Sequence, residues 1–133
     1  MQVFSGIDIV HIPRFELQIQ LPGTTFLDAF SSIEIADAKR TPLFAQSLAG
    51  KWAAKEAFIK AWSLSLLGKP LPILDIHAKM HQIEVQKDVF YRPHLRLGRT
   101  VKSAFEKSLP DAHLSISISH DADYATAICT LTA

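Results

Sequence analysis

A long stretch without proline constrains the fold of this chain more than any other feature. It runs from residue 43 to residue 67, follows Pro42, and ends before Gly68 and Pro70, residue types that start and stop helices. At about 100° per residue, one narrow arc collects Leu48, Trp52, Ile59, Trp62 and Leu66. The pattern predicts one long helix with a firmly packed face.

The segments on either side have the patterns of strands. Residues 113–119 (HLSISIS) alternate apolar and polar side chains, and residues 124–131 follow after a short polar turn, which predicts an antiparallel hairpin. Residues 3–10 (VFSGIDIV) are apolar on both faces and predict a strand covered on both sides. Further strand signals lie at residues 73–76, 82–87 and 91–97.

Shorter helices complete the predicted fold. Pro13 fits the first turn of one helix, and Ser31 with Glu34 predicts a second that is capped. Gly98 opens another over residues 99–109. Together the elements predict an α+β fold, with one long helix packed on a mostly antiparallel sheet. With 133 residues, of which 48% are hydrophobic and 20% charged, we expect a single domain over residues 1–133.

Composition argues against several kinds of function. The formal net charge is +1, so no broad basic field points to nucleic acid as the partner. No apolar run approaches the roughly 18 residues of a membrane span. The start of the chain carries Asp8 and no basic segment, unlike a signal peptide, so a cytoplasmic location is expected. A single cysteine, Cys129, excludes an internal disulfide and a thiolate metal cluster.

Asp8 is the first residue that points to chemistry, because it interrupts an apolar strand between Ile7 and Ile9. Burying an unpaired carboxylate is costly, so Asp8 needs a cation, a hydrogen-bond network or a strand end open to solvent. Two interpretations follow. Asp8 is either a functional carboxylate or a strand-end residue that caps the helix beginning near Pro13.

Glu56 is the second candidate, and it lies on the shoulder of the apolar stripe of the long helix. Lys60 follows one turn later and Lys55 falls near the centre of the stripe. Three charged groups on or near a packed face are unusual. The alternative is a surface ion pair between Glu56 and Lys60, which stabilises a helix only slightly.

Ser119 and His120 end the alternating strand and form the third candidate. The alternative is a turn histidine satisfied by local backbone. The chain has no nucleophile elbow, P-loop or dinucleotide-binding glycine motif. His77 and His81 are spaced like zinc ligands on a helix, but their strand-like surroundings argue against a shared helical face.

Three motifs, taken in order, resemble a known family. They are GIDIV at residues 6–10, KWAAKEAFIKAW at residues 51–62 and SISISH at residues 115–120. The family is the holo-acyl-carrier-protein synthases, the small bacterial 4′-phosphopantetheinyl transferases of fatty acid biosynthesis. The resemblance covers almost the whole chain. It implies the fold of that family and transfer of phosphopantetheine from coenzyme A to a serine of apo acyl carrier protein, with release of 3′,5′-ADP. It also implies a homotrimer with active sites between subunits.

The resemblance implies a role for each matching residue. Asp8 and Glu56 would hold Mg²⁺, which prefers oxygen ligands, and would be catalytic together with Lys60. Lys60 would also contact the phosphates of coenzyme A, with Lys55 in support. The rest of the coenzyme A site would contain Ser119, His120, Arg92 and Pro93.

The acyl carrier protein would dock on another part of the chain. The resemblance places Arg14 against this acidic partner, with Phe15 and residues 25–30 lining the same surface. The serine proton would pass to Glu56 or to a water held near Asp8. Sequence reasoning leaves these two acceptors open.

One departure from the family pattern lies beside the expected adenine site. The usual Gly-Lys/Arg-Pro is replaced by Tyr91-Arg92-Pro93, so the close backbone approach that glycine permits is in doubt. Two other functions therefore stay open. One is a module that binds coenzyme A without transferring anything, and the other is a carrier-protein docking subunit that uses Arg14.

Overall fold

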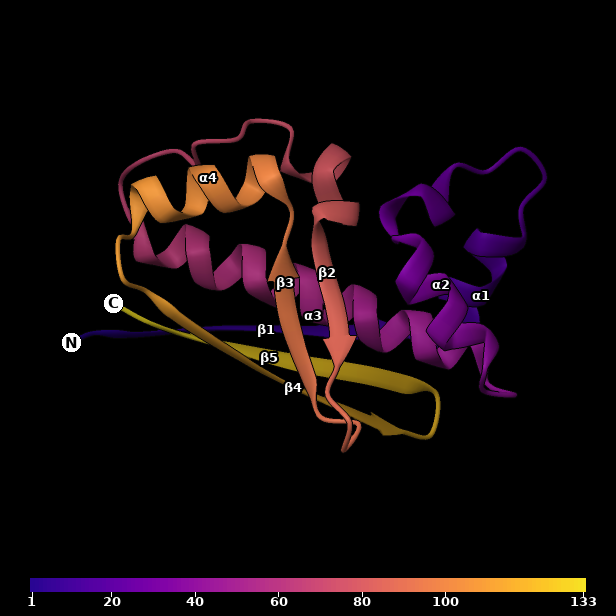
Figure 1. Ribbon diagram of the computed structural model, residues 1–133. Helices are drawn as coiled ribbons and strands as arrows, with labels where there is room; N and C mark the ends of the chain where they lie inside the picture. Colours follow the sequence, from indigo (N-terminus) through magenta and orange to yellow (C-terminus); the bar gives the residue numbers. More distant parts are fainter.

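Five strands and six helical segments make up the computed structural model, which describes all residues from Met1 to Ala133 (Figure 1). In chain order they are β1 (Val3–His11), α1 (Ile12–Gln20), η1 (Phe26–Ala29), α2 (Ser32–Lys39), α3 (Phe44–Ser65), η2 (Ile76–Gln82), β2 (Ile83–Lys87), β3 (Pro93–Leu97), α4 (Arg99–Ser108), β4 (His113–Asp121) and β5 (Tyr124–Thr132). The segments η1 and η2 are 3₁₀ helices.

The three longest strands form one antiparallel sheet in the order β1–β5–β4, and β2 and β3 form a separate antiparallel hairpin. Helix α3 lies against one face of the three-stranded sheet (Figure 1). In the same view α4 lies above α3, and the β2–β3 hairpin passes in front of it. The predicted α+β fold, with one long helix packed on a mostly antiparallel sheet, is confirmed.

Gly6 allows β1 to lie directly against α3. A Cβ atom at this position would come within 1.9 Å of the Ala57 carbonyl oxygen and 2.7 Å of the Ala61 backbone nitrogen. Strand side chains alternate between two faces, so Asp8, two residues further on, also faces the helix. The glycine therefore determines where the Asp8 carboxylate meets α3.

Helix α3 is buried on most sides, whereas the sequence predicted a single packed face. Ala53, Ala54 and Ala57 are fully buried. The rings of Phe58 and Trp62 pack on Phe105 of α4, with centroid distances of 5.5 and 5.4 Å. A helix with the sheet on one side and α4 on the other has no wholly polar face. For this reason the apolar arc in the sequence predicted less burial of α3 than the structure shows.

Most predicted elements agree with the structure, but residues 73–76 do not form a strand. Ile73 and Ile76 are both buried and stand three residues apart, a spacing that fits the turn entering η2 rather than the alternation of a strand. Pro13 lies in the first turn of α1, and Ser31 and Glu34 form a capping box at α2, as predicted. No helix has the length and apolar character needed to cross a membrane.

The face of β1 that points away from α3 is exposed. Ile7 and Ile9 are each 65% exposed, and Ile128, which pairs with Ile7 from β5, is also exposed. The prediction that this strand is covered on both sides is therefore wrong for the single chain. These side chains form an apolar stripe on the outer face of the sheet.

Candidate active site

Asp8 lies where β1 crosses α3, and its side chain is 17% exposed. Its Oδ1 accepts a hydrogen bond from Lys60 Nζ at 3.1 Å, and the same ammonium donates to the Ile7 carbonyl oxygen at 2.9 Å. The cap of α1 is His11, whose Nδ1 accepts a hydrogen bond from the Arg14 amide. The helix-capping interpretation of Asp8 is therefore wrong, and the carboxylate is paired with a lysine instead.

Glu56 projects from the same side of α3 as Lys60, because residues four apart on a helix are neighbours on its surface. Its side chain is 18% exposed, and its Oε1 lies 3.0 Å from His77 Nε2. Glu56 and Lys60 do not pair with each other, so the surface ion-pair interpretation is wrong as well. Lys60 reaches Asp8 on β1, whereas Glu56, one turn before it on α3, reaches His77 on η2.

His77 is a functional candidate that sequence reasoning missed. Its spacing in the sequence relates it only to His81, whereas its contact joins η2 to α3 across a separation of 21 residues. No group of three or more His, Cys, Asp or Glu side chains in the structure is arranged to hold a metal. No local pattern in the chain pointed to Glu56 as the partner of His77.

Lys55 lies in the core, and this corrects the expectation that it lines the coenzyme A site. Its Nζ donates to Glu34 Oε1 at 2.8 Å and to the carbonyl oxygens of Met80 and Ile83 at 2.7 Å each. Burial lowers the pKa of the Lys55 ammonium, and the Glu34 carboxylate opposes that shift. All three donors are used inside the protein, so none is left for a phosphate.

Glu34 completes this buried group. Besides Lys55, its carboxylate accepts hydrogen bonds from the Ser31 amide at 3.0 Å and the Val85 amide at 2.9 Å. One carboxylate thus joins α2, α3 and β2 without contact with solvent. The capping motif revealed Glu34 in the sequence, but its role as the partner of Lys55 depends on tertiary packing.

Ser119 and His120 lie near the end of β4, on opposite faces of the sheet. His120 packs against Gly50 of α3, where a Cβ atom would come within 2.8 Å of its Nε2. In the sheet register His120 pairs with Ala125, whereas Asp8 pairs with Ala127 on the opposite edge of β5. His120 and Asp8 are thus two strands apart, and within one chain His120 does not join the carboxylates.

The tip of the β2–β3 hairpin carries the expected adenine-side residues. Asp88 Oδ1 accepts hydrogen bonds from the Phe90 and Arg92 amides at 2.8 and 2.9 Å, and its Oδ2 lies 2.8 Å from Arg92 Nε. Between them Tyr91 adopts a φ of 64°, the left-handed region that favours glycine. The backbone therefore keeps the glycine-like bend, while the tyrosine side chain is 81% exposed.

Arg14 is exposed on α1, so a partner can reach it. Leu17, one turn further along the helix, is also exposed. Phe15 and Phe30, by contrast, are buried with their rings 6.3 Å apart. The expectation that these two phenylalanines line a docking surface is therefore corrected, because both belong to the core beneath it.

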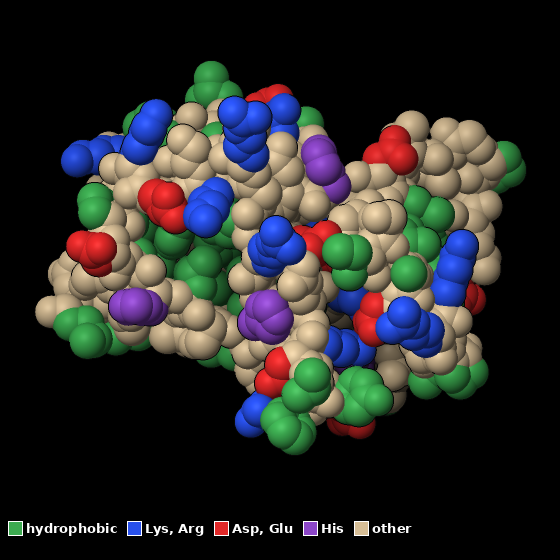
Figure 2. Space-filling view, in the orientation of Figure 1, with side chains coloured by type: hydrophobic (Ala, Val, Ile, Leu, Met, Phe, Trp, Pro, Cys, Tyr) green, Lys and Arg blue, Asp and Glu red, His purple; other side chains and the backbone are tan.

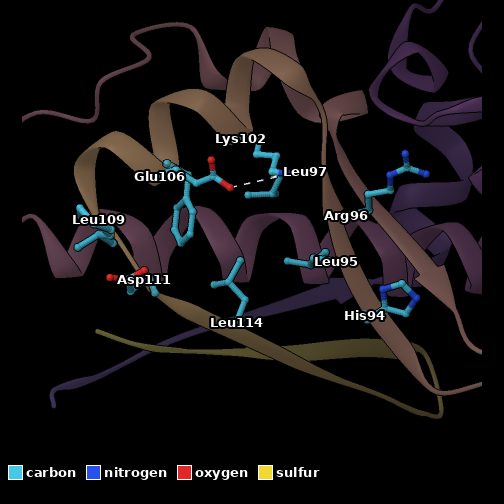
Figure 3. Close-up of a pocket in the computed structure, with 12 residues that line it drawn as sticks. His94, Leu95, Arg96, Leu97, Lys102, Glu106, Leu109, Asp111 and Leu114 are labelled. Carbon is cyan, nitrogen blue, oxygen red and sulfur yellow. Dashed lines mark ion pairs between the residues drawn. The ribbon is translucent and has the colours of Figure 1, made fainter.

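A groove of about 890 Å³ lies between β3, α4 and the start of β4, away from these residues (Figure 3). In the space-filling view this face is hollowed, with an apolar floor and charged side chains around it (Figure 2). Leu95, Leu97 and Leu114 line it, beside the Lys102–Glu106 ion pair at 3.9 Å. Neither carboxylate of the candidate site lines this groove.

Comparisons with known proteins agree with the resemblance of the three motifs. Residues 5–129 match the family model of the 4′-phosphopantetheinyl transferase superfamily. A holo-[acyl-carrier-protein] synthase of Corynebacterium efficiens is 43% identical over 95% of this chain and 91% of its own length.

Solved structures of holo-[acyl-carrier-protein] synthases are similar to this chain as well. The ACPS–CoA complex of Chronobacterium ammoniagenes superposes with a TM-score of 0.95 at 43% identity, covering 99% of this chain and 98% of that chain. The Helicobacter pylori holo-[acyl-carrier-protein] synthase in complex with coenzyme A gives a TM-score of 0.72 at 31% identity, covering 96% of this chain and 99% of that one. The fold and the motifs together place this chain in the 4′-phosphopantetheinyl transferase superfamily, as a member of its holo-[acyl-carrier-protein] synthase family.

Proposed function

We propose that this protein transfers the 4′-phosphopantetheine group of coenzyme A to a serine of an apo acyl carrier protein. The observation that carries the proposal is the hydrogen bond between Lys60 and Asp8, one helical turn from Glu56 on α3. It occurs in a chain similar to holo-[acyl-carrier-protein] synthases over nearly its whole length. Two carboxylates and an ammonium suit a reaction at a pyrophosphate, where negative charge develops on the leaving group.

Asp8 and Glu56 fit a divalent cation such as Mg²⁺. Both offer oxygen atoms, and both are partly exposed, so water and a phosphate oxygen can complete the ligand set as this ion prefers. When bound, Mg²⁺ would neutralise charge on the pyrophosphate of coenzyme A. With two carboxylates from the chain, the remaining ligands would come from water and the substrate.

The remaining steps belong to the chain itself. The serine oxygen attacks the β-phosphorus of coenzyme A, and the bond to 3′,5′-ADP breaks. Lys60 is more than half exposed and stabilises the charge on the phosphates. The serine proton passes to Glu56 or to a water held near Asp8. Arg14, exposed on α1, contacts the acidic carrier protein that brings the serine.

The protein acts as a homotrimer, and each site lies between two subunits. Two observations support this part of the proposal. The exposed apolar stripe of β1 and β5 is a surface that a second copy would cover. Ser119 and His120 lie on β4, two strands from Asp8 of their own chain, so a neighbouring subunit would bring these coenzyme A contacts to the site.

A transfer assay tests the proposed function. The protein is incubated with coenzyme A, Mg²⁺ and apo acyl carrier protein, and the mass of the carrier is measured. We expect a gain of one phosphopantetheine group with the wild type, and none with Glu56→Gln. Glu106→Gln is the matched control, because this exposed carboxylate lies on α4 away from the site and should leave transfer unchanged. An unmodified carrier with the wild type would overturn the proposal.

A second function is favoured by one observation, the tyrosine at position 91. If its exposed side chain alters the adenine site, the protein could bind coenzyme A without transferring its arm. Calorimetry with coenzyme A, run beside the transfer assay, separates the two functions. Binding without transfer would favour the binding module.

A further inference from the structure

The contact between His77 and Glu56 is not explained by the proposed chemistry alone. His77 lies on η2 with its side chain 63% exposed, yet its Nε2 lies 3.0 Å from an oxygen of a partly buried carboxylate. An exposed histidine has no need of an internal partner, because water can satisfy both ring nitrogens. The contact therefore matters more to the Glu56 carboxylate than to the imidazole.

The neighbours of His77 hold it in place. Ile76, the residue before it, is buried in the core. Met80, one turn later, is fully buried, and its carbonyl oxygen accepts the hydrogen bond from Lys55 at 2.7 Å. Two consecutive residues of α3 thus contact η2: Lys55 donates to the Met80 carbonyl oxygen, and Glu56 contacts the His77 side chain. The backbone that carries His77 is therefore anchored on both sides by buried residues.

We propose that His77 is a positioning residue, which orients the Glu56 carboxylate for a divalent metal ion. The inference rests on the proposed metal site. With a proton on Nε2, the imidazole donates to Oε1, which fixes the rotation of the carboxylate and leaves Oε2 to a metal ion. Carboxylates that bind metals are commonly held by such hydrogen bonds, and their loss costs about 10–100-fold in metal affinity.

Binding of Mn²⁺, followed by electron paramagnetic resonance without coenzyme A, tests this role apart from catalysis. We expect His77→Ala to weaken Mn²⁺ binding by about 10-fold or more. His77→Gln should retain most of the affinity, because its amide can donate to the same oxygen. His81→Ala is the matched control, since this exposed histidine of η2 makes no contact with Glu56. In the transfer assay, excess Mg²⁺ should restore the kcat of His77→Ala.

The outcomes separate this inference from the proposed function. Unchanged or tighter Mn²⁺ binding by His77→Ala, with binding lost in Glu56→Gln, would overturn the role of His77 and leave the metal site intact. Equal losses in His77→Ala and His77→Gln would also overturn it, because the amide would then fail to replace the donor. If Glu56→Gln binds Mn²⁺ like the wild type, the metal site itself is wrong.

Discussion

At the scale of single residues, the hairpin tip between β2 and β3 stores backbone strain. Tyr91 has a φ of 64°, and the left-handed conformation costs about 1–2 kcal/mol for a residue with a Cβ atom. Asp88 offsets this cost with its hydrogen bonds to the Phe90 and Arg92 amides. The hydrogen bonds from Arg92, foremost that from its amide, hold the pKa of the Asp88 carboxyl below its usual value.

Replacing Tyr91 by glycine should therefore stabilise the protein. We expect Tyr91→Gly to raise the free energy of unfolding by about 0.5–1 kcal/mol, because the relief of strain exceeds the entropy that glycine adds to the unfolded chain. Urea denaturation measures the change. Phe90→Gly is the control, since Phe90 is also exposed but lacks a positive φ. Equal stabilisation by both variants would contradict the assignment of strain to position 91.

The buried pair of Glu34 and Lys55 is a second feature of single residues that affects the stability of the fold. Glu34→Gln leaves the Lys55 ammonium buried without its counter-charge, and we expect it to lower the free energy of unfolding by about 3–5 kcal/mol. Adding Lys55→Met removes the uncompensated charge and should recover part of that loss. Denaturation of the single and double variants checks both expectations. A double variant no more stable than Glu34→Gln would show that the charge is not the cause.

Among the elements, α2, α3 and β2 are joined a second time at Asp37. Its Oδ2 lies 2.8 Å from Lys51 Nζ and 3.0 Å from Lys87 Nζ. Partial burial raises the pKa of the Asp37 carboxyl, but its hydrogen bonds and charge interactions with Lys51 and Lys87 outweigh this and hold the pKa below 3.8. The ionised form is therefore favoured more in the folded protein than in the unfolded chain.

This shift gives a pH dependence with a definite sign. A carboxylate whose folded pKa is depressed contributes stability above its unfolded pKa and loses it as the pH falls through the folded value. We expect Asp37→Asn to be less stable than the wild type near neutral pH by about 1 kcal/mol, with the gap closing below pH 3.8. Urea midpoints measured across this range test it. A wild-type midpoint that stays above that of Asp37→Asn by the same amount below about pH 3 would contradict this origin of the stability.

The same elements show what a sequence reveals and what it does not. Helix starts at Pro13 and Ser31 follow from neighbouring residues, so local patterns predicted them. The order of Asp8, Glu56 and Lys60 was also visible through the motifs. The apolar stripe placed Lys55 on the packed face, but the η2 partners of Lys55 and Glu56 were not visible, because they lie more than twenty residues away in the chain. The spacing of apolar residues along a helix shows which face is packed, but it does not show which carbonyl groups accept hydrogen bonds from a buried lysine.

At the scale of the whole molecule, two groups of the proposed site lie far apart within one chain. Asp8 and His120 occupy opposite edges of one sheet, and the outer face of that sheet is apolar and exposed at Ile7, Ile9 and Ile128. In a closed ring of identical subunits, each copy would use one edge for its own site and offer the other edge to its neighbour. If the site is shared in this way, two variants that each lack one of its groups should complement each other, which a site within one chain would not allow.

Two inactive variants should restore each other when they assemble together. Glu56→Gln lacks a carboxylate and His120→Ala lacks a coenzyme A contact, so we expect each trimer alone to lose most transfer. The two variants are then unfolded, mixed in equal amounts and refolded. A complete site forms where a His120→Ala subunit, which keeps Glu56, lies beside a Glu56→Gln subunit, which keeps His120. Random mixing gives about one quarter of sites intact, and hence about one quarter of wild-type activity. Mixing the folded proteins without refolding is the control. Activity no higher than in either variant alone would mean that Glu56 and His120 act within one chain, whatever the oligomeric state.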